Sequence, residues 1–353
     1  MEHVHRRRAR MNARIAPALV LTCLVAGGSA TRLAAQYPLA PTPVLDLSLL
    51  SPEPRFSGYV SVRETWRHDT STFVINRARV TVQTRPLPYA AVRIQTDFSA
   101  VGQSRGDTVP PVALTDAYLQ ISPTDTAGWL SHIRPALIVG QFRTPFSLEF
   151  LTSFSLLPIA NRSQASDRIA KRRDIGVLGQ IRVGTVATVT TALVNGEGGN
   201  RARNTDGRQT AIGRVTVFPT RFAQVSAKGL TQSGDRGWGF DARVMAGAVI
   251  VEGESIWRDA HSEVTTTACG SGGYVLAAYR LTRWLQPAVK WEHLHERACT
   301  PTAPSVGRLT WMTYGVVVAA PEQRVRFQLN WLVKTARPVD QSNEVVAQLI
   351  GIF

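Results

Sequence analysis

Residues 343–353 read Asn-Glu-Val-Val-Ala-Gln-Leu-Ile-Gly-Ile-Phe, and this stretch decides the fold prediction. Glu344, Val346 and Gln348 alternate with apolar neighbours, and Phe353 occupies the last position. An alternation with a period of two puts one set of side chains on each face of a β-strand. This pattern, ending on an aromatic residue, is typical of the closing strand of an outer-membrane β-barrel. The alternative is an edge strand of a soluble domain.

The other end of the chain predicts export. Five arginines up to Arg14 precede a mostly apolar stretch from Ile15 to Ala26, and Ala34 and Ala35 follow as a small-residue cleavage site. These are the three parts of a secretory signal peptide, which we assign to residues 1–35. We therefore expect the mature protein in the bacterial outer membrane.

The composition of the mature chain excludes one class of function. Removing residues 1–35 takes away six Arg and one Glu, which leaves 34 basic and 24 acidic residues and a formal charge of +10. An exported protein is not expected to bind nucleic acid despite this charge. Because only four residues of the chain are lysines, nearly all of the positive charge is guanidinium, which suits contact with oxyanions.

Alternating polar and apolar residues, separated by turn residues, predict sixteen strands near the length of about 9 to 11 residues that a tilted membrane strand needs. The predicted strands are 56–66, 72–84, 89–99, 112–122, 134–142, 174–183, 185–195, 208–218, 221–231, 237–247, 248–259, 272–281, 284–294, 308–319, 323–333 and 343–353. Tight connections follow the even-numbered strands from the sixth to the fourteenth, whereas long polar connections follow several odd-numbered ones. This asymmetry favours a bacterial barrel over a soluble β-sandwich or β-helix. The sequence thus predicts an all-β fold, a 16-stranded antiparallel transmembrane β-barrel over 56–353, with 36–55 as a periplasmic lead-in segment.

Charged residues occupy only one face of several predicted strands. An Arg or Lys that faces lipid at mid-membrane costs about 2 to 4 kcal/mol, so these faces are expected to line a water-filled lumen. The expected lumen-wall cations are Arg77, Arg79, Arg93, Lys290, Arg324 and Arg326.

Two cysteines remain after the predicted cleavage. Cys269 and Cys299 fall in the connections after predicted strands 11 and 13, and we expect a disulfide that joins two extracellular loops. The alternative is two free or metal-binding cysteines. His293 and His295 share a strand face with Trp291, so we place them at the outer aromatic rim and predict no metal site. Because single Ser and His residues are scattered without a catalytic grouping, we expect no enzyme and no cofactor.

The longest connection, residues 143–173, is expected to be functional because compact domains rarely contain a structureless loop of that length. The sequence in and around it contains Gly140-Gln-Phe-Arg-Thr-Pro-Phe146, Glu149, Leu151-Thr-Ser153, Arg162, and Arg173-Asp-Ile-Gly-Val177 with Gly179. Further on come Asn195-Gly-Glu-Gly-Gly-Asn200 and Gly213-Arg-Val215, which leads to Phe218-Pro219. With these motifs, the region from about residue 130 to 220 resembles the phosphate-selective porin O and P family.

Members of that family are trimeric sixteen-stranded barrels whose long third extracellular loop folds inward and narrows the pore. The resemblance therefore implies a homotrimer in outer-membrane lipid, with 143–173 as the inward-folded constriction loop. Asn161 stands where many members have Glu before the arginine that matches Arg162. The lysine clusters of phosphate-selective members have no counterpart in this chain.

Basic residues in the loop favour anions as the solute. A narrow aqueous passage lined by guanidinium groups raises the local anion concentration, and weak successive sites allow the anion to leave. The candidate constriction residues are Arg143, Arg162, Arg168, Lys171, Arg172 and Arg173. Each could instead be solvated or paired with an acid such as Asp167 or Asp174. We predict an outer-membrane porin for small inorganic anions, phosphate among them. The alternatives are a general-diffusion or other-solute porin and a barrel that acts as a structural anchor or adhesin.

Overall fold

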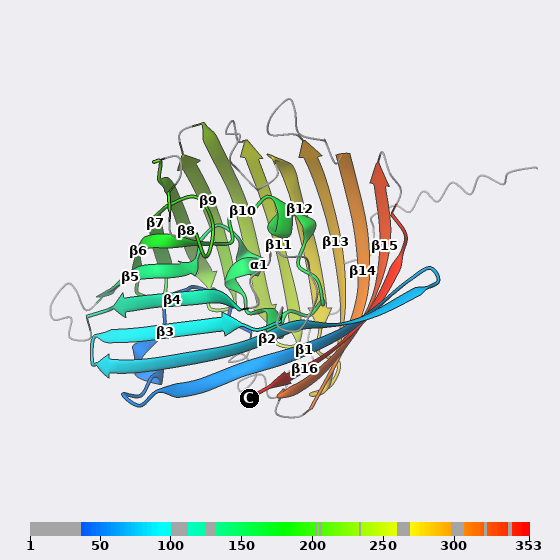
Figure 1. Cartoon of the computed structure of the whole chain (residues 1–353), viewed down its shortest axis with the longest axis horizontal. Helices are drawn as coiled ribbons and strands as arrows, with labels where there is room; N and C mark the ends of the chain where they lie inside the picture. The colour runs from blue at the N-terminus through cyan, green and yellow to red at the C-terminus, as the bar shows by residue number, and fades with distance from the viewer. Residues whose placement is uncertain are drawn as a thin grey trace, which may run out of the picture.

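The structure, a computed structural model, describes residues 37–99, 112–123, 132–201, 203–204, 207–232, 234–259, 269–297, 307–320, 323–337 and 341–353. Sixteen antiparallel strands form one closed barrel, in which β16 pairs with β1 (Figure 1). The predicted fold class is confirmed. Among the described residues, no helix is long and apolar enough to span a membrane.

The strands follow one another around the barrel in chain order. Their bounds are β1 (Arg55–Arg67), β2 (Thr70–Leu87), β3 (Ala90–Asp97), β4 (Ala113–Ile121), β5 (Ile133–Arg143), β6 (Arg173–Val183), β7 (Ala187–Val194), β8 (Thr210–Thr220), β9 (Ala223–Gln232), β10 (Asp235–Ala246), β11 (Val249–Asp259), β12 (Cys269–Tyr279), β13 (Leu285–Arg297), β14 (Gly307–Ala319), β15 (Val325–Arg337) and β16 (Glu344–Ile352).

Two predicted strand ends are wrong in ways that matter for function. β12 begins at Cys269 rather than at residue 272, so Cys269 is a strand residue and not a loop residue. The following glycines allow this because β12 passes close to β13: a Cβ on Gly270 would lie 2.0 Å from the carbonyl oxygen of His295. Arg324 precedes β15 and is exposed in a turn, because Gln323 adopts a positive φ of 59° and its N–H closes the turn onto Ala320.

The two faces of the barrel differ as the alternation predicts. Along β15, Arg326, Gln328 and Asn330 are buried on the inner face, whereas Phe327 and Leu329 are exposed on the outer face. An apolar outer band with a polar interior is the arrangement that a bilayer requires of a barrel. The polar inner face is buried because two chain segments occupy the interior.

The first of these segments is the connection from β5 to β6, residues 144–172. It contains two short α-helices, α1 (Leu148–Leu151) and α2 (Gln164–Arg168), and one 3-10 helix, η3 (Phe154–Leu156). Figure 1 shows α1 surrounded by the barrel strands. The second segment, residues 37–50, precedes β1 and ends in the 3-10 helix η1 (Leu47–Leu49).

The seam between β1 and β16 closes on the last residue of the sequence. Phe353 N–H donates to the carbonyl oxygen of Gly58 at 3.1 Å, and Gly58 N–H donates back to the carbonyl oxygen of Phe353 at 3.0 Å. A Cβ on Gly58 would lie 2.5 Å from the Phe353 ring and 2.2 Å from the carbonyl oxygen of Arg79. The seam therefore requires glycine at position 58.

Candidate functional site: the barrel lumen

Residues 144–172 cross the lumen and hydrogen-bond to the far side of the barrel. The backbone N–H of Leu148 donates to Glu254 Oε1 on β11 at 2.8 Å. Lys290 Nζ on β13 donates to the carbonyl oxygen of Asn161 at 2.8 Å. Because β11 and β13 lie roughly half of the barrel away from β5 and β6, these contacts fasten the segment across the interior.

The N-terminal strap, our name for residues 37–50, also lies in the lumen. Tyr37 Oη donates to Glu252 Oε2 on β11 at 3.0 Å, and Tyr118 Oη on β4 donates to the carbonyl oxygen of Pro43 at 2.7 Å. The strap thus runs from β11 to β4, near the end of the barrel that has the short β10–β11 connection. The assignment of residues 36–55 as a periplasmic lead-in segment stays a prediction. Proline-rich backbone has carbonyl groups without partners, and side chains of the inner wall satisfy them.

Arg93, Arg143 and Arg173 converge on one carboxylate, that of Asp116. Arg173 Nε donates to Asp116 Oδ1 at 2.8 Å, Arg93 Nε donates to Oδ2 at 3.2 Å, and Arg143 Nε lies 4.0 Å from Oδ2. Arg143 and Arg173 are directly opposite each other on β5 and β6, where two like charges repel unless an anion lies between them. Three cations share one carboxylate, so the cluster has two uncompensated positive charges.

Further arginines continue this positive wall. Arg79 Nε donates to Asp97 Oδ2 at 2.8 Å, and Arg77 Nε lies 3.9 Å from the same atom. Arg63, which is not among the residues predicted from the sequence, donates to Asn161 Oδ1 at 2.8 Å. We call the six side chains the arginine arc: Arg63, Arg77, Arg79, Arg93, Arg143 and Arg173. The arginine arc has six guanidinium groups, and two carboxylates, those of Asp97 and Asp116, pair with them. This leaves an excess of four positive charges.

Two predicted constriction residues instead hold the loop together. Arg162 is 7% exposed, its Nε donates to the carbonyl oxygen of Glu149 at 3.0 Å, and its guanidinium lies 4.4 Å from the centre of the Phe150 ring. Burial lowers the pKa of Arg162 to about 10. Lys171 Nζ donates to the carbonyl oxygen of Gly196 at 2.6 Å, and burial, followed by the charge of Arg258, lowers the pKa of Lys171 to about 8.

The remaining loop cations differ in exposure. Arg168 Nη1 donates to Glu296 Oε2 on β13 at 2.7 Å. Arg172 is exposed, with its Nη2 3.9 Å from Asp167. Of the other predicted wall cations, Lys290 is buried against the loop as described, and Arg326 donates to the loop carbonyls of Ser155 and Leu157. The structure therefore brings Arg77, Arg79, Arg93, Arg143 and Arg173 together but not the other predicted site residues.

The opposite wall is close to neutral. Lys228 Nζ donates to Asp241 Oδ2 at 2.9 Å and contacts Glu254, and Arg214 Nη2 donates to Asp241 Oδ1 at 2.7 Å. The buried groups of β8–β13 are five cations and six carboxylates. They are Arg214, Lys228, Arg243, Arg258 and Lys290 with Asp235, Asp241, Glu252, Glu254, Glu292 and Glu296. Of these residues, only Lys290 was predicted from the sequence as a site residue, although the same alternation places the others inward.

Glu149, in α1, is a buried carboxyl group at the point where the loop meets this wall. It is 1% exposed, its Oε2 accepts a hydrogen bond from the backbone N–H of Ser163 at 2.6 Å, and Lys290 Nζ lies 3.8 Å from its Oε1. Burial raises the pKa of Glu149 to about 7, although Lys290 and the Ser163 N–H oppose this shift.

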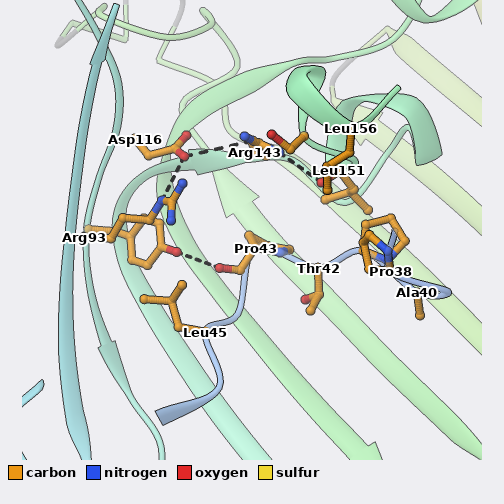
Figure 2. A pocket seen from close by; sticks show the side chains of 13 residues that line it. Pro38, Ala40, Thr42, Pro43, Leu45, Arg93, Asp116, Arg143, Leu151 and Leu156 are labelled. Carbon is orange, nitrogen blue, oxygen red and sulfur yellow. Dashed lines mark hydrogen bonds and ion pairs between the residues drawn. The ribbon is translucent and has the colours of Figure 1, made fainter. Parts of the chain in front are cut away.

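A cavity of about 280 Å³ separates the strap from the arginine arc (Figure 2). We call it the Arg93 pocket. Its lining consists of Pro38, Ala40, Pro41, Thr42, Pro43, Leu45, Arg93, Asp116, Tyr118, Arg143, Leu151, Ser153 and Leu156. A second cavity of about 330 Å³ shares Pro38, Ala40 to Pro43 and Leu151 with the first and extends to residues of β6–β8. The strap therefore separates two solute-sized spaces.

The structure bears on the cysteine and histidine predictions in part. Cys269 forms a disulfide, whereas its predicted partner Cys299 lies outside the described residues. His293 is on the outer face, with its ring 5.1 Å from that of Trp291. Within the described ranges, no group of three His, Cys, Asp or Glu side chains could hold a metal ion.

Comparison with known proteins gives structural likenesses only. No protein-family model matches the chain, and no curated protein matches it in sequence. Among solved structures, OmpF of Salmonella typhi in complex with daunomycin is 10% identical with a TM-score of 0.64, over 86% of this chain and 98% of that one. The trimer form of OmpT, an outer-membrane protein of Vibrio cholerae, is 10% identical with a TM-score of 0.61, over 86% and 100%. The anion-selective porin of Comamonas acidovorans is 10% identical with a TM-score of 0.60, over 85% and 99%. These likenesses show that the chain has the barrel fold of bacterial outer-membrane porins.

Proposed function

We propose that this protein is an outer-membrane porin through which small anions diffuse passively. The observation that supports this is the arginine arc, in which six guanidinium groups face two carboxylates while the opposite wall is nearly balanced. An excess of one sign of charge on one side of a narrow, low-dielectric passage raises the local concentration of counter-ions. Residues 144–172 would be the constriction loop that brings solutes close to this wall.

Arginine, rather than lysine, would attract the anion. All four lysines have protein partners: Lys171, Lys228, Lys290 and Lys334. A lysine-lined path for phosphate is therefore not supported. Guanidinium groups bind oxyanions through two parallel hydrogen bonds. We therefore propose that the channel selects anions in general and not phosphate in particular.

We also propose that the protein lies in the outer membrane as a homotrimer. The apolar outer face suits a bilayer, and one protein of like fold is described as a trimer. Chemical cross-linking in detergent, followed by sedimentation, tests the assembly. We expect three chains per particle, and a monodisperse monomer at high protein concentration would contradict the trimer.

The reversal potential across a planar bilayer tests anion selectivity. Under a potassium chloride gradient, we expect the refolded protein to give a reversal potential with the same sign as the equilibrium potential of chloride. Arg77→Gln and Arg93→Gln should each move the potential toward zero, because each removes one charge of the arginine arc. Arg236→Gln is the matched control, since Arg236 is exposed on the outer face of β10.

Each other outcome identifies an alternative. A near-zero reversal potential with high conductance would mean a general-diffusion porin in which the arc is neutralised. A folded protein with no conductance at any voltage would mean a structural barrel, because the loop and the strap then close the lumen.

A further inference from the structure

We propose that the Arg93 pocket is a binding subsite for small organic carboxylates with an apolar body, and that it binds them in preference to inorganic phosphate. This inference deepens the proposed function and rests on it, because the solute must reach the lumen. It assigns a solute class to one cavity and a role in specificity to the strap.

The guanidinium groups of the pocket have donors to spare. Arg93 uses Nε for Asp116, and among the described residues neither of its terminal nitrogens has a protein acceptor. Arg143 donates from Nη1 to the carbonyl oxygens of Phe150 and Leu151. Its Nη2 has no protein acceptor among the described residues. Asp116 thus fixes the orientation of the Arg93 guanidinium and the loop carbonyl oxygens fix that of Arg143, while the outer edges of both groups remain available (Figure 2). A ligand carboxylate can accept from such edges with both of its oxygens.

The rest of the lining is mainly apolar. Pro41, Pro43 and Leu45 of the strap contribute one side, and Leu151 and Leu156 of the loop contribute another. The hydroxyl of Tyr118 is already used, since it donates to the carbonyl oxygen of Pro43. A ligand that fills the cavity therefore finds charged donors at one end and hydrocarbon at the other.

This division of polarity discriminates between two kinds of anion. Inorganic phosphate has polar oxygens on all sides, so those that face proline and leucine would lose hydrogen bonds to water without replacement. A short fatty acid places its carboxylate at Arg93 and its methylene groups against the apolar lining. Each buried methylene then tightens binding roughly fourfold. The cavity of about 280 Å³ is near the lower limit of small-molecule sites, which favours chains of a few carbons.

The strap is held firmly enough to act as part of the site. Gln120 on β4 binds Leu45 through both its amide atoms: its Oε1 accepts from the Leu45 N–H at 2.7 Å, and its Nε2 donates to the Leu45 carbonyl oxygen at 2.8 Å. At the other end of the strap, Arg243 Nη1 donates to the carbonyl oxygen of Pro38 at 2.5 Å. The apolar side of the pocket is therefore a fixed surface.

Ligand-observed NMR on the refolded protein in detergent tests the proposal without any need for current. Acetate, propionate, butyrate and valerate are titrated individually, with inorganic phosphate as the contrasting anion and empty micelles as the blank. We expect the dissociation constant of the carboxylates to fall about two- to fourfold with each added methylene. The dissociation constant of phosphate should be at least ten times that of butyrate. Arg93→Gln should weaken butyrate binding at least tenfold, whereas Arg134→Gln, an exposed arginine at the start of β5, should leave it unchanged.

A second variant separates the apolar part of the site from the charged part. Leu45→Ser keeps the backbone hydrogen bonds to Gln120 and should flatten the chain-length dependence while acetate binding stays the same. It also serves as the test if Arg93→Gln does not fold, which heat-dependent migration on a gel would reveal. Phosphate that binds as tightly as butyrate, or a chain-length dependence that Leu45→Ser leaves intact, would overturn the proposal.

The two proposals can fail separately. If the reversal potential is anion-selective but the NMR titration shows no chain-length dependence, only the carboxylate subsite is wrong. If the titration shows the expected series but the bilayer shows no current, the subsite exists in a barrel that does not conduct.

Discussion

Protonation of Glu149 should control how firmly the loop, residues 144–172, is attached to the barrel wall. Burial raises the pKa of this carboxyl group to about 7 from an ordinary value of 4.5. A raised pKa means that the docked loop favours the protonated form, so this stabilisation is complete below pH 4.5 and is lost as the pH rises through 7. The side chain is 1% exposed, so solvent screening does not reduce the effect.

The magnitude follows from the size of the shift. A difference of about 2.5 pKa units corresponds to about 3 kcal/mol, and about 2.5 kcal/mol of this falls between pH 5 and pH 8. The docked loop should therefore open on the order of 70-fold more often at pH 8 than at pH 5. Glu149→Gln keeps an acceptor for the Ser163 N–H but cannot ionise, so it should abolish this dependence.

Hydrogen–deuterium exchange of peptides from residues 144–172 measures loop opening directly. After correction for the intrinsic effect of pH on exchange, protection in the wild type should fall between pH 5 and pH 8, while protection in Glu149→Gln should stay constant. Glu53→Gln, a change of an exposed carboxylate in the segment before β1, is the matched control and should behave like the wild type. If wild type and Glu149→Gln lose protection in parallel, Glu149 is not the group that titrates and the reasoning is refuted.

Three further predictions concern the seam, the arginine cluster and the disulfide. Gly58→Ala should destabilise the closed barrel, because the added Cβ would overlap the Arg79 carbonyl oxygen and the Phe353 ring. Gly351→Ala should not, because no atom lies within 4 Å of its added Cβ, and heat-dependent migration on a gel distinguishes the two variants. Asp116→Asn should lower the free energy of unfolding in urea by about 3 to 5 kcal/mol, because it leaves three partly buried guanidinium groups without their carboxylate, and a change below 1 kcal/mol would contradict the assigned pairing. Peptide mapping without reductant should recover Cys269 linked to Cys299, and reduction should cost about 2 to 5 kcal/mol of stability; recovery of either cysteine as a free thiol would disprove the pair.

The sequence predicted the barrel well because lipid imposes a strict rule on every strand. A charged side chain on the outer face is costly, so the alternation in β15 of Arg326, Gln328 and Asn330 with apolar residues had only one reading. The same rule predicts Arg77, Arg79 and Arg93 on the inner face, and these residues form ion pairs with Asp97 and Asp116.

The contents of the lumen follow no such rule. The strap has no periodicity, and its proline-rich sequence suits an extended linker as well as a plug. Its place depends on single side chains far away in the sequence, such as Tyr118 and Gln120. Similarly, Arg162 could not be distinguished from a pore-lining cation, because its role depends on its contact with Phe150 and the carbonyl oxygen of Glu149.

The seam between Gly58 and Phe353 has a consequence for the order of assembly. The first and last strands of the ring are the most distant in sequence, and each has only the other to cover its outer edge. Until the final residues arrive, the growing sheet exposes two unpaired edges that can pair with other chains. Closure also requires the meeting of segments with the largest separation in the chain, which makes it slow relative to the formation of local hairpins. Protection of nascent barrels from one another is therefore most important in the interval before β16 reaches β1.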